Sequence, residues 1–345
     1  MEILGLSVAV LVLFVSFGFM VGVFFGFFGM GGSFLVTPAL LILGYPATVA
    51  IGSSMAFVFG TAVIATLKHQ DIGQVDYKLG ALMFAGIALG VEAGKTLVLV
   101  LDALGRAEVV VGGVYVLLLA GIGALFTRSA LDGDETEVER DEGMTSGDDD
   151  IPDIAKRIKS YRIPPMVTLK DGSEASLWTI SGVGGGVGIV SGFLGVGGGF
   201  IRMPAIYYLI GVPLAAAVGT SLFGALMSGA IGAYTYGLSG VIDLGVVTAL
   251  LTGSALGARI GSAATAYVDE DDVTIYFGIM LLLSSVAVLF GELANWLAIP
   301  ILESLSFVLL VGSAVLVTLV IFYHGIAAIR EDSTVSPPTP EHGDC

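Results

Sequence analysis

Long runs without a charged residue constrain this chain more than any other feature of its sequence. Residues 3–67 contain no Asp, Glu, Lys or Arg, and neither do residues 175–201, 203–242, 273–291 and 304–329. About 20 consecutive apolar residues suffice for a helix to cross the hydrocarbon core of a bilayer. Because a mean hydropathy of +0.95 is incompatible with a water-facing globule, we expect an all-α polytopic membrane protein.

The apolar runs and their breaks predict eight or nine transmembrane helices. They lie at about 3–25, 47–67, 77–101, 107–127, 176–191, 213–236, 241–266, 273–291 and 304–328. The first is longer than the roughly 7 to 15 apolar residues of a signal peptide, and no basic region precedes it. Segments 26–44 and 192–211 are too glycine-rich for one smooth helix and too short for two, so we expect half-helices or re-entrant segments there.

Glycine, proline and hydroxyl positions recur in both halves of the chain, which indicates an internal repeat. When Gly26 is set on Gly192, the match comprises Gly29 on Gly195, Gly31 on Gly197, Gly32 on Gly198 and Pro38 on Pro204. After one inserted residue it continues from Pro46 on Pro213 to Gly94 on Gly261. The sequence leaves open whether the two repeats are inverted or parallel in the membrane.

The repeat divides the chain into four parts. Residues 1–127 form the first membrane repeat, 128–174 an acidic polar linker, 175–329 the second repeat with an additional C-terminal helix, and 330–345 a polar tail. Much of the net charge of −16 lies in residues 132–153, which lack apolar periodicity and are predicted to be solvated and disordered in part. Cation capture is the alternative, but composition favours a water-facing loop, and we assign it no site.

Basic residues near the ends of the spans indicate an orientation. Lys68 and Lys78 flank one loop and four more basic residues lie within 156–162, whereas the acidic loop 269–272 contains none. With four spans in the first half and a cytoplasmic N-terminus, both basic regions would be cytoplasmic. The acidic loop would then lie outside.

The paired glycine turns are the first candidate for a substrate site. The first turn contains Gly29, Gly31, Gly32 and Ser33, and the second contains Gly195, Gly197, Gly198 and Gly199. A turn inside a membrane is tolerated only where it lines protein or water. Internally repeated membrane proteins often bind substrates at such interruptions near the midplane. The alternative is that the glycines only permit tight helix packing.

Arg202 and two hydroxyl pairs complete the predicted site. Arg202 is the one charged residue in 175–242, and a charge at membrane depth marks a functional site unless it snorkels to a headgroup. Its guanidinium could bind an oxyanion through two N–H groups. Hydroxyls could add uncharged ligands, or they could bond their own helices. These hydroxyls, at matching positions, belong to Ser53, Ser54, Thr220 and Ser221.

Two glycine stripes at four-residue spacing predict close helix packing. They consist of Gly86, Gly90 and Gly94, and of Gly253, Gly257 and Gly261. Glu92 and Arg259 occupy matching positions away from the stripes and could pair across the two halves as a gate or coupling pair. The alternative partner of Glu92 is Lys95, three residues later on the same helix.

Motifs for catalysis, metal binding or nucleic-acid binding are not recognisable in the sequence. The histidines have no companions at ligand spacing, the only cysteine is Cys345, and the net charge is negative. Asp76 and Asp243 are explained as helix N-caps. We therefore expect no enzyme activity, cofactor, metal or nucleic acid. The expected partners are a lipid bilayer and a small anion, and a homo-oligomer is left open.

Two glycine-containing stretches resemble the TauE/SafE family, also called the sulfite exporter family. They read GFFGMGGSFLVTPALL and GFLGVGGGFIRMPAIYYLIGVPLAAAVGTSLF, and the resemblance covers roughly residues 18–94 and 184–261. It implies a permease of the cell membrane for sulfur-containing anions such as sulfite, sulfoacetate or other organosulfonates, usually exported from the cytoplasm. The acidic linker and the extra C-terminal helix depart from a minimal family member.

Together these features predict a secondary transporter of small anions that works by alternating access and is driven by the membrane potential or a proton. An inside-negative potential favours anion export by about 2.3 kcal/mol per charge per 100 mV, so no ATP site is required. Two alternatives stay open. One is an anion uptake permease or channel, and the other is a membrane scaffold or sensor that acts through the acidic linker.

Overall fold

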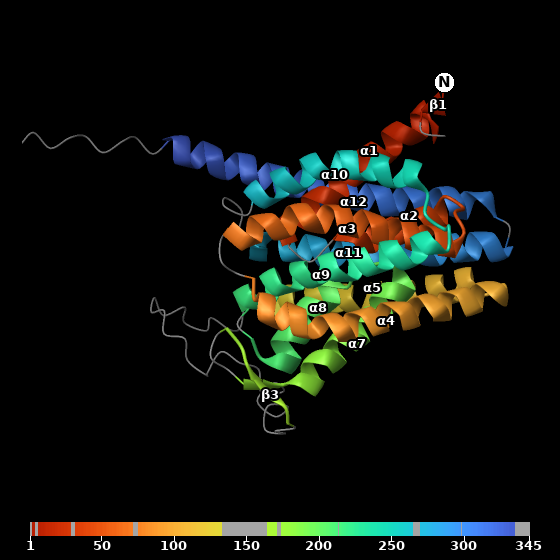
Figure 1. Cartoon of the computed structure of the whole chain (residues 1–345). Helices are drawn as coiled ribbons and strands as arrows, with labels where there is room; N and C mark the ends of the chain where they lie inside the picture. The colour runs from red at the N-terminus through yellow and green to blue at the C-terminus, as the bar shows by residue number, and fades with distance from the viewer. Residues whose placement is uncertain are drawn as a thin grey trace, which may run out of the picture.

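The computed structural model of the chain is a bundle of long helices whose axes run roughly along one line, some up and some down (Figure 1). The structure describes residues 2–3, 6–28, 32–71, 75–132, 164–170, 174–212, 214–264, 270–297 and 299–334. Within these ranges, nine helices are long and apolar enough to cross a membrane. This confirms the all-α, multi-pass membrane class and the larger of the two predicted span counts.

The first half of the chain begins with a small β-hairpin, which is followed by five α-helices, four long and one short. Its elements are β1 (Glu2–Ile3), β2 (Leu6–Ser7), α1 (Val8–Phe28), the 3₁₀ turn η1 (Gly32–Leu35), α2 (Val36–Ile42), α3 (Ala47–Asp71), α4 (Tyr77–Ala103) and α5 (Ala107–Asp132). Segment 26–44 thus holds the short pieces expected after the first glycine turn. Helix α5 continues past residue 127, the predicted end of the first repeat.

The second half follows a two-stranded hairpin at the end of the predicted linker. Its elements are β3 (Met166–Thr168), β4 (Glu174–Ser176), α7 (Leu177–Leu194), α8 (Gly199–Ala205), the π turn η3 (Ile206–Ile210), α9 (Leu214–Leu238), α10 (Leu244–Ala264), α11 (Glu270–Leu297) and α12 (Pro300–Thr334). Residues 133–163, most of the acidic linker, and the tail beyond residue 334 lie outside the described residues.

The glycine stripes join helices of different halves. Gly86, Gly90 and Gly94 of α4 lie against the backbones of Ser181, Gly185 and Ile189 of α7, and Gly253, Gly257 and Gly261 of α10 lie against Val15, Phe19 and Val23 of α1. Residue numbers rise together in both pairs, so each pair is parallel. In the alignment of the halves α1 matches α7 and α4 matches α10, so one packing arrangement occurs twice with the halves exchanged.

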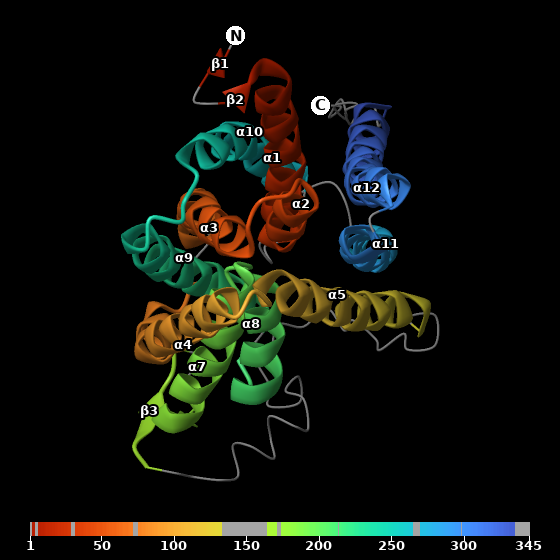
Figure 2. The ribbon, with the colours of Figure 1, turned by 90° about the vertical axis from the view of Figure 1, so that its right-hand side faces the viewer.

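Helices α3 and α9 cross the centre of the bundle between these two pairs, as Figure 2 shows along the helix axes. Gly229 of α9 lies against Phe59 of α3, and Gly232 lies against Met55. Because one number falls as the other rises, α3 and α9 are antiparallel. One apolar core contains buried side chains from both halves, so the halves are not separate domains.

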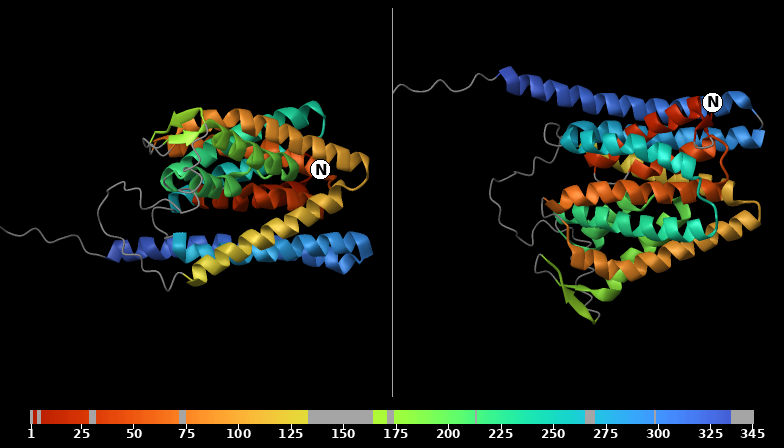
Figure 3. Two further views of the ribbon diagram at one scale, coloured as in Figure 1. Left: turned by 90° about the horizontal axis from the view of Figure 1, so that it is seen from below. Right: turned by 45° about the horizontal axis from the view of Figure 1, so that its top comes forward.

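The two ends of the bundle carry different loops (Figure 3). One end, which we call the hairpin end, holds the start of α4 and the hairpin of β3 and β4. The two are joined there by a hydrogen bond of 3.2 Å from the backbone N–H of Lys170 to Asp76 Oδ2. At the opposite end, the Tyr45 end, Ser53 at the start of α3 accepts from the backbone N–H of Asp243 at the start of α10.

The predicted membrane topology is wrong in two respects. Helices α3 and α10 start together at the Tyr45 end, so α10 finishes at the hairpin end. The start of α11 is therefore at the same end of the bundle as the start of α4, not at the opposite end. Helix α1 runs parallel to α10, which places the N-terminus at the Tyr45 end. The reason is two short returns: η1 and α2 lead the chain back toward the Tyr45 end, and α8 and η3 lead it back toward the hairpin end, so each changes the parity of crossings.

Candidate functional site

The glycine turn of the second half interrupts the chain between α7 and α8. Gly195, Gly197 and Gly198 have φ angles of 75°, 65° and 74°. Residues other than glycine rarely adopt positive φ angles. A Cβ atom at Gly195 would also lie 2.8 Å from Thr37 Oγ1 and 3.0 Å from Ile51 Cα. Glycine is therefore required at this position both by conformation and by contact with the first half.

Two phenylalanines bring the glycine turns of both halves together. Phe34 and Phe200 pack edge to face with ring centroids 5.6 Å apart, and they occupy matching positions in the alignment of the halves. Of the predicted residues in the first turn, Gly29 and Gly31 lie outside the described residues, and Gly32 and Ser33 belong to η1. The described residues that follow the first turn therefore contact those that follow the second turn through Phe34.

Arg202 lies on α8, three residues after the turn, and is completely buried, with 0% of its surface exposed. Its Nη1 donates to the carbonyl oxygen of Ser221 at 3.0 Å. Its Nη2 donates to the carbonyl oxygen of Gly197 and to Ser228 Oγ, both at 3.1 Å. Arg202 therefore holds the glycine turn against α9 and does not reach a headgroup.

The charge of Arg202 has no acidic partner among the described residues. Its hydrogen-bond acceptors are all neutral, and Nε is buried without any partner. Ser228, which contacts the guanidinium, lies near the middle of the span Ala216–Leu238, so the charge sits near the membrane midplane. A charge at that depth without an acidic partner is costly, which makes Arg202 the first candidate for a functional residue.

The predicted hydroxyls fall into two groups. Ser221 Oγ donates to the carbonyl oxygen of Gly199 at 2.9 Å, and Ser54 Oγ accepts from Thr37 Oγ1 at 2.8 Å, so both lie beside the second turn. Thr220 and Ser53 instead accept from backbone N–H groups of Asp76 and Asp243, each at 3.0 Å. The structure therefore places the hydroxyls of Ser54 and Ser221 beside the second glycine turn, whereas those of Ser53 and Thr220 bond the starts of α10 and α4.

The cross-pair of Glu92 with Arg259 is not formed. Glu92 Oε1 lies 3.7 Å from Nζ of Lys95 on its own helix, which was the alternative partner. Helix α4 packs on α7 and α9, whereas α10 packs on α1 and α3, so the central helices separate Glu92 from Arg259 (Figure 2). The sequence matched the two positions correctly but could not reveal that matching helices lie on opposite sides of the bundle.

Three residues of this centre were missed from the sequence, namely Thr37, Gly224 and Ser228. Gly224 and Ser228 follow Ser221 by three and seven residues, so all three lie on one face of α9. This helical spacing is the signal that could have found them. Thr37 carries no comparable signal, because only its contact with Ser54 and Gly195 distinguishes it from an ordinary helix threonine.

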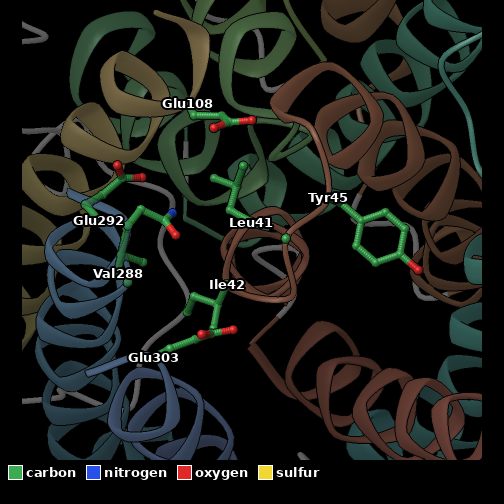
Figure 4. A pocket seen from close by; sticks show the side chains of 10 residues that line it. Leu41, Ile42, Tyr45, Glu108, Val288, Glu292 and Glu303 are labelled. Atoms are coloured by element: carbon green, nitrogen blue, oxygen red, sulfur yellow. The ribbon is translucent and has the colours of Figure 1, made fainter. Parts of the chain in front are cut away.

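An open pocket of about 210 Å³ lies at the Tyr45 end, away from Arg202. Figure 4 shows that Glu108, Glu292 and Glu303 approach it from α5, α11 and α12 around the end of α2. Burial and the nearby Asp243 raise the pKa of Tyr45, which also lines it, so this hydroxyl stays neutral at physiological pH. Among the described residues, no three or more acidic, His or Cys side chains are grouped so that they could hold a metal ion.

A nine-span helical bundle with broken helices at its centre and an unpaired guanidinium near the midplane has the construction of a membrane transporter. A family model described as "Sulfite exporter TauE/SafE" matches residues 14–288. The chain therefore belongs to the TauE/SafE family of membrane transporters, as its sequence resemblance predicted.

Relatives named as probable membrane transporters match most of the chain. A "Probable membrane transporter protein" of Xylella fastidiosa strain Temecula1 is 25% identical over 298 residues, which are 85% of this chain and all of that protein. The "Probable membrane transporter protein YunE" of Bacillus subtilis is 24% identical over 280 residues, 79% of this chain and 94% of that protein. No solved structure matches.

Proposed function

We propose that this protein is a secondary transporter of small sulfur-containing oxyanions such as sulfite, sulfoacetate or other organosulfonates. The observation that carries the proposal is Arg202, which is fully buried near the midplane with Nε unpartnered. The family description, sulfite exporter, supports sulfur oxyanions as the substrate class. A guanidinium matches the geometry of oxyanions because two of its N–H groups bind two oxygens at once.

Alternating access between two inverted halves is the mechanism that we propose. The antiparallel course of α3 and α9 supports inverted repeats, since these helices match in the alignment. The exchanged pairs α1 with α10 and α4 with α7 support the same symmetry. In this mechanism the glycine turns and Arg202 stay near the centre while access changes between the two ends.

The hairpin end is the cytoplasmic end in our proposal. It carries Lys78, Arg128, Lys170 and Arg259, whereas only Lys95 and Arg106 lie toward the Tyr45 end among the described residues. Basic residues accumulate on the cytoplasmic side of membrane proteins. An inside-negative potential drives anions from that side outward, by about 2.3 kcal/mol per charge per 100 mV, which supports export as the direction.

The test is efflux of labelled sulfite and sulfoacetate from proteoliposomes that contain the purified full chain. We expect the wild type to transport at least one of them, and an imposed inside-negative potential to accelerate efflux. Arg202→Ala should reduce the rate at least tenfold. Arg106→Ala is the matched control, because this arginine is exposed in the loop between α4 and α5, and it should transport like the wild type.

The outcome also separates the alternatives. Equal rates for folded Arg202→Ala and wild type would remove the arginine from the transport path. Failure of a folded wild type to move either anion would remove sulfur oxyanions as substrates. If deletion of linker residues 133–163 abolished cellular function while transport in liposomes was unchanged, the scaffold or sensor role would be favoured instead.

A further inference from the structure

The backbone of α9 at Gly224 packs directly against the side chain of Arg202. A Cβ atom at this position would lie 2.6 Å from Cδ, 2.8 Å from Nε and 3.0 Å from Cζ of Arg202. The arginine has little room to give way, because it is fully buried and makes three hydrogen bonds. The absence of a side chain at Gly224 is therefore what lets the guanidinium lie against α9.

Ser228, one turn further along α9, occupies the place that a ligand oxygen would take. Its Oγ accepts from Nη2 of Arg202 at 3.1 Å and donates to the carbonyl oxygen of Gly197 at 2.6 Å. The carbonyl oxygen of Ala225 offers a second acceptor at 3.1 Å. Because a hydroxyl donates through one O–H and also accepts, Ser228 can release Nη2 and turn its O–H from a carbonyl oxygen to a bound anion.

The donors of Arg202 that remain define where an anion would bind. A guanidinium has five N–H groups, and the three hydrogen bonds of Arg202 use one on Nη1 and two on Nη2. The N–H of Nε is buried without a partner. It shares one edge of the guanidinium with an N–H of Nη2, and this edge is one of those that bind two oxygens of an oxyanion side by side.

We infer that Arg202, Gly224 and Ser228 form a single oxyanion subsite, a specificity determinant of the transporter proposed above. Two oxygens of a sulfite or sulfonate head group accept from Nε and Nη2, and Ser228 changes from accepting Nη2 to donating to the anion. The inference rests on the proposed function and extends it. Because the guanidinium is buried, the anion enters when the turn at Gly197 moves off α9.

The first half has no equivalent of this subsite, so one anion binds per chain. In the alignment of the halves, Val36 stands at the position of Arg202, Phe57 at that of Gly224 and Thr61 at that of Ser228. Val36 and Phe57 are both completely buried apolar side chains. Thr61 donates to the carbonyl oxygen of Phe57 on its own helix at 3.0 Å, so that half supplies no cation and no space for one.

The experiment measures sulfite binding to the full chain in detergent by isothermal titration calorimetry. We expect one sulfite per wild-type chain. Gly224→Ala should weaken the affinity at least tenfold, and Ser228→Ala should weaken it three- to tenfold. The matched control is Gly237→Ala on the same helix, where a Cβ would meet only Ile242 Cδ1 at an ordinary 3.5 Å, and it should bind like the wild type.

Three results would overturn the inference. These are wild-type affinity in a folded Gly224→Ala variant, wild-type affinity in Ser228→Ala, and two sulfites per wild-type chain. If Gly224→Ala does not fold, the double variant Gly224→Ala, Arg202→Ala should restore folding, because it removes the colliding side chain, and continued misfolding would count against the contact. If the wild type transports sulfite and all variants have its affinity, only the subsite is contradicted. If the wild type neither binds nor transports sulfite, the proposed substrate is contradicted as well.

Discussion

Asp76 and Thr220 are joined by a hydrogen bond across 144 residues of sequence, from the backbone N–H of Asp76 to Thr220 Oγ1 at 3.0 Å. At the opposite end of the bundle, the backbone N–H of Asp243 donates to Ser53 Oγ at the same distance. In the alignment of the halves, Asp76 matches Asp243 and Thr220 matches Ser53. The same bond is therefore made twice, once near each end, between the start of one helix and a central helix of the other half.

Removing one of these bonds should shift the transporter toward one open state. Thr220→Ala leaves a buried backbone N–H without its acceptor at the hairpin end, a loss of about 1 to 3 kcal/mol. We expect it to favour opening at that end, and Ser53→Ala to favour opening at the Tyr45 end. Accessibility of single cysteines placed near each end, in a Cys345→Ser background, measures the shift.

The double variant Ser53→Ala, Thr220→Ala provides the internal control for this experiment. Because it weakens both ends equally, its accessibility should return toward that of the wild type. Thr235→Ala, on the same helix as Thr220 but bonded only to its own helix, should change nothing. A shift in the same direction for Ser53→Ala and Thr220→Ala would show that the two bonds do not act as opposing gates.

Glycines on the two faces of α7 should differ in their tolerance of alanine. At Gly188 a Cβ would lie 2.7 Å from the carbonyl oxygen of Ile87, whereas at Gly186 it would meet nothing within 4 Å. Gly188→Ala should therefore lower the free energy of unfolding by about 1 to 3 kcal/mol. Gly186→Ala, two residues away, should be neutral or slightly stabilising, since alanine favours helix. Thermal unfolding in detergent compares them, and equal losses would refute the packing of α7 on α4.

Tyrosine hydroxyls should stabilise the end of α7 that leads into the glycine turn. Tyr236 donates to the carbonyl oxygen of Gly192 at 2.8 Å and Tyr115 donates to that of Leu194, so each bonds a carbonyl in the last turn of the helix, where intrahelical partners run out. Tyr236→Phe should cost about 1 to 3 kcal/mol. Tyr234→Phe, exposed two residues earlier, is the control. Hydrogen exchange should increase around Gly195 in the first variant only.

The orientation can be tested with two reporter cysteines in a Cys345→Ser background. Leu104 lies exposed in the loop at the Tyr45 end, and Thr168 lies exposed on β3 at the hairpin end. A membrane-impermeant maleimide added to intact cells should label Leu104→Cys, and it should label Thr168→Cys only after permeabilisation. The opposite pattern would place the hairpin end outside and reverse the proposed direction of transport.

Several features of the fold could be predicted from residue patterns alone. Apolar runs located all nine spans to within a few residues at most boundaries. Glycines four residues apart predicted close packing, because only a missing side chain lets two backbones touch, and Gly90 and Gly257 do touch a neighbouring helix. Arg202 stood out because a charge in an apolar run needs an explanation.

Other features depended on which helices meet in space. The sequence matched Glu92 with Arg259, but the two helices lie on different sides of α3 and α9, and Glu92 pairs with Lys95 instead. It grouped Ser53 with Ser54, although neighbouring residues on a helix point about 100° apart and their hydroxyls bond different partners. The topology failed because a short return such as η1 with α2 has no hydropathy signal of its own.

The sequence by itself determined that this protein is a multi-span membrane bundle with two glycine-rich breaks and one arginine inside an apolar run, because hydropathy and glycine spacing act through local rules of solvation and close approach. Only the tertiary structure decided what surrounds that arginine. Gly224 and Ser228 face it because α8 folds back on α9, a contact between helices that no pattern within either of them specifies.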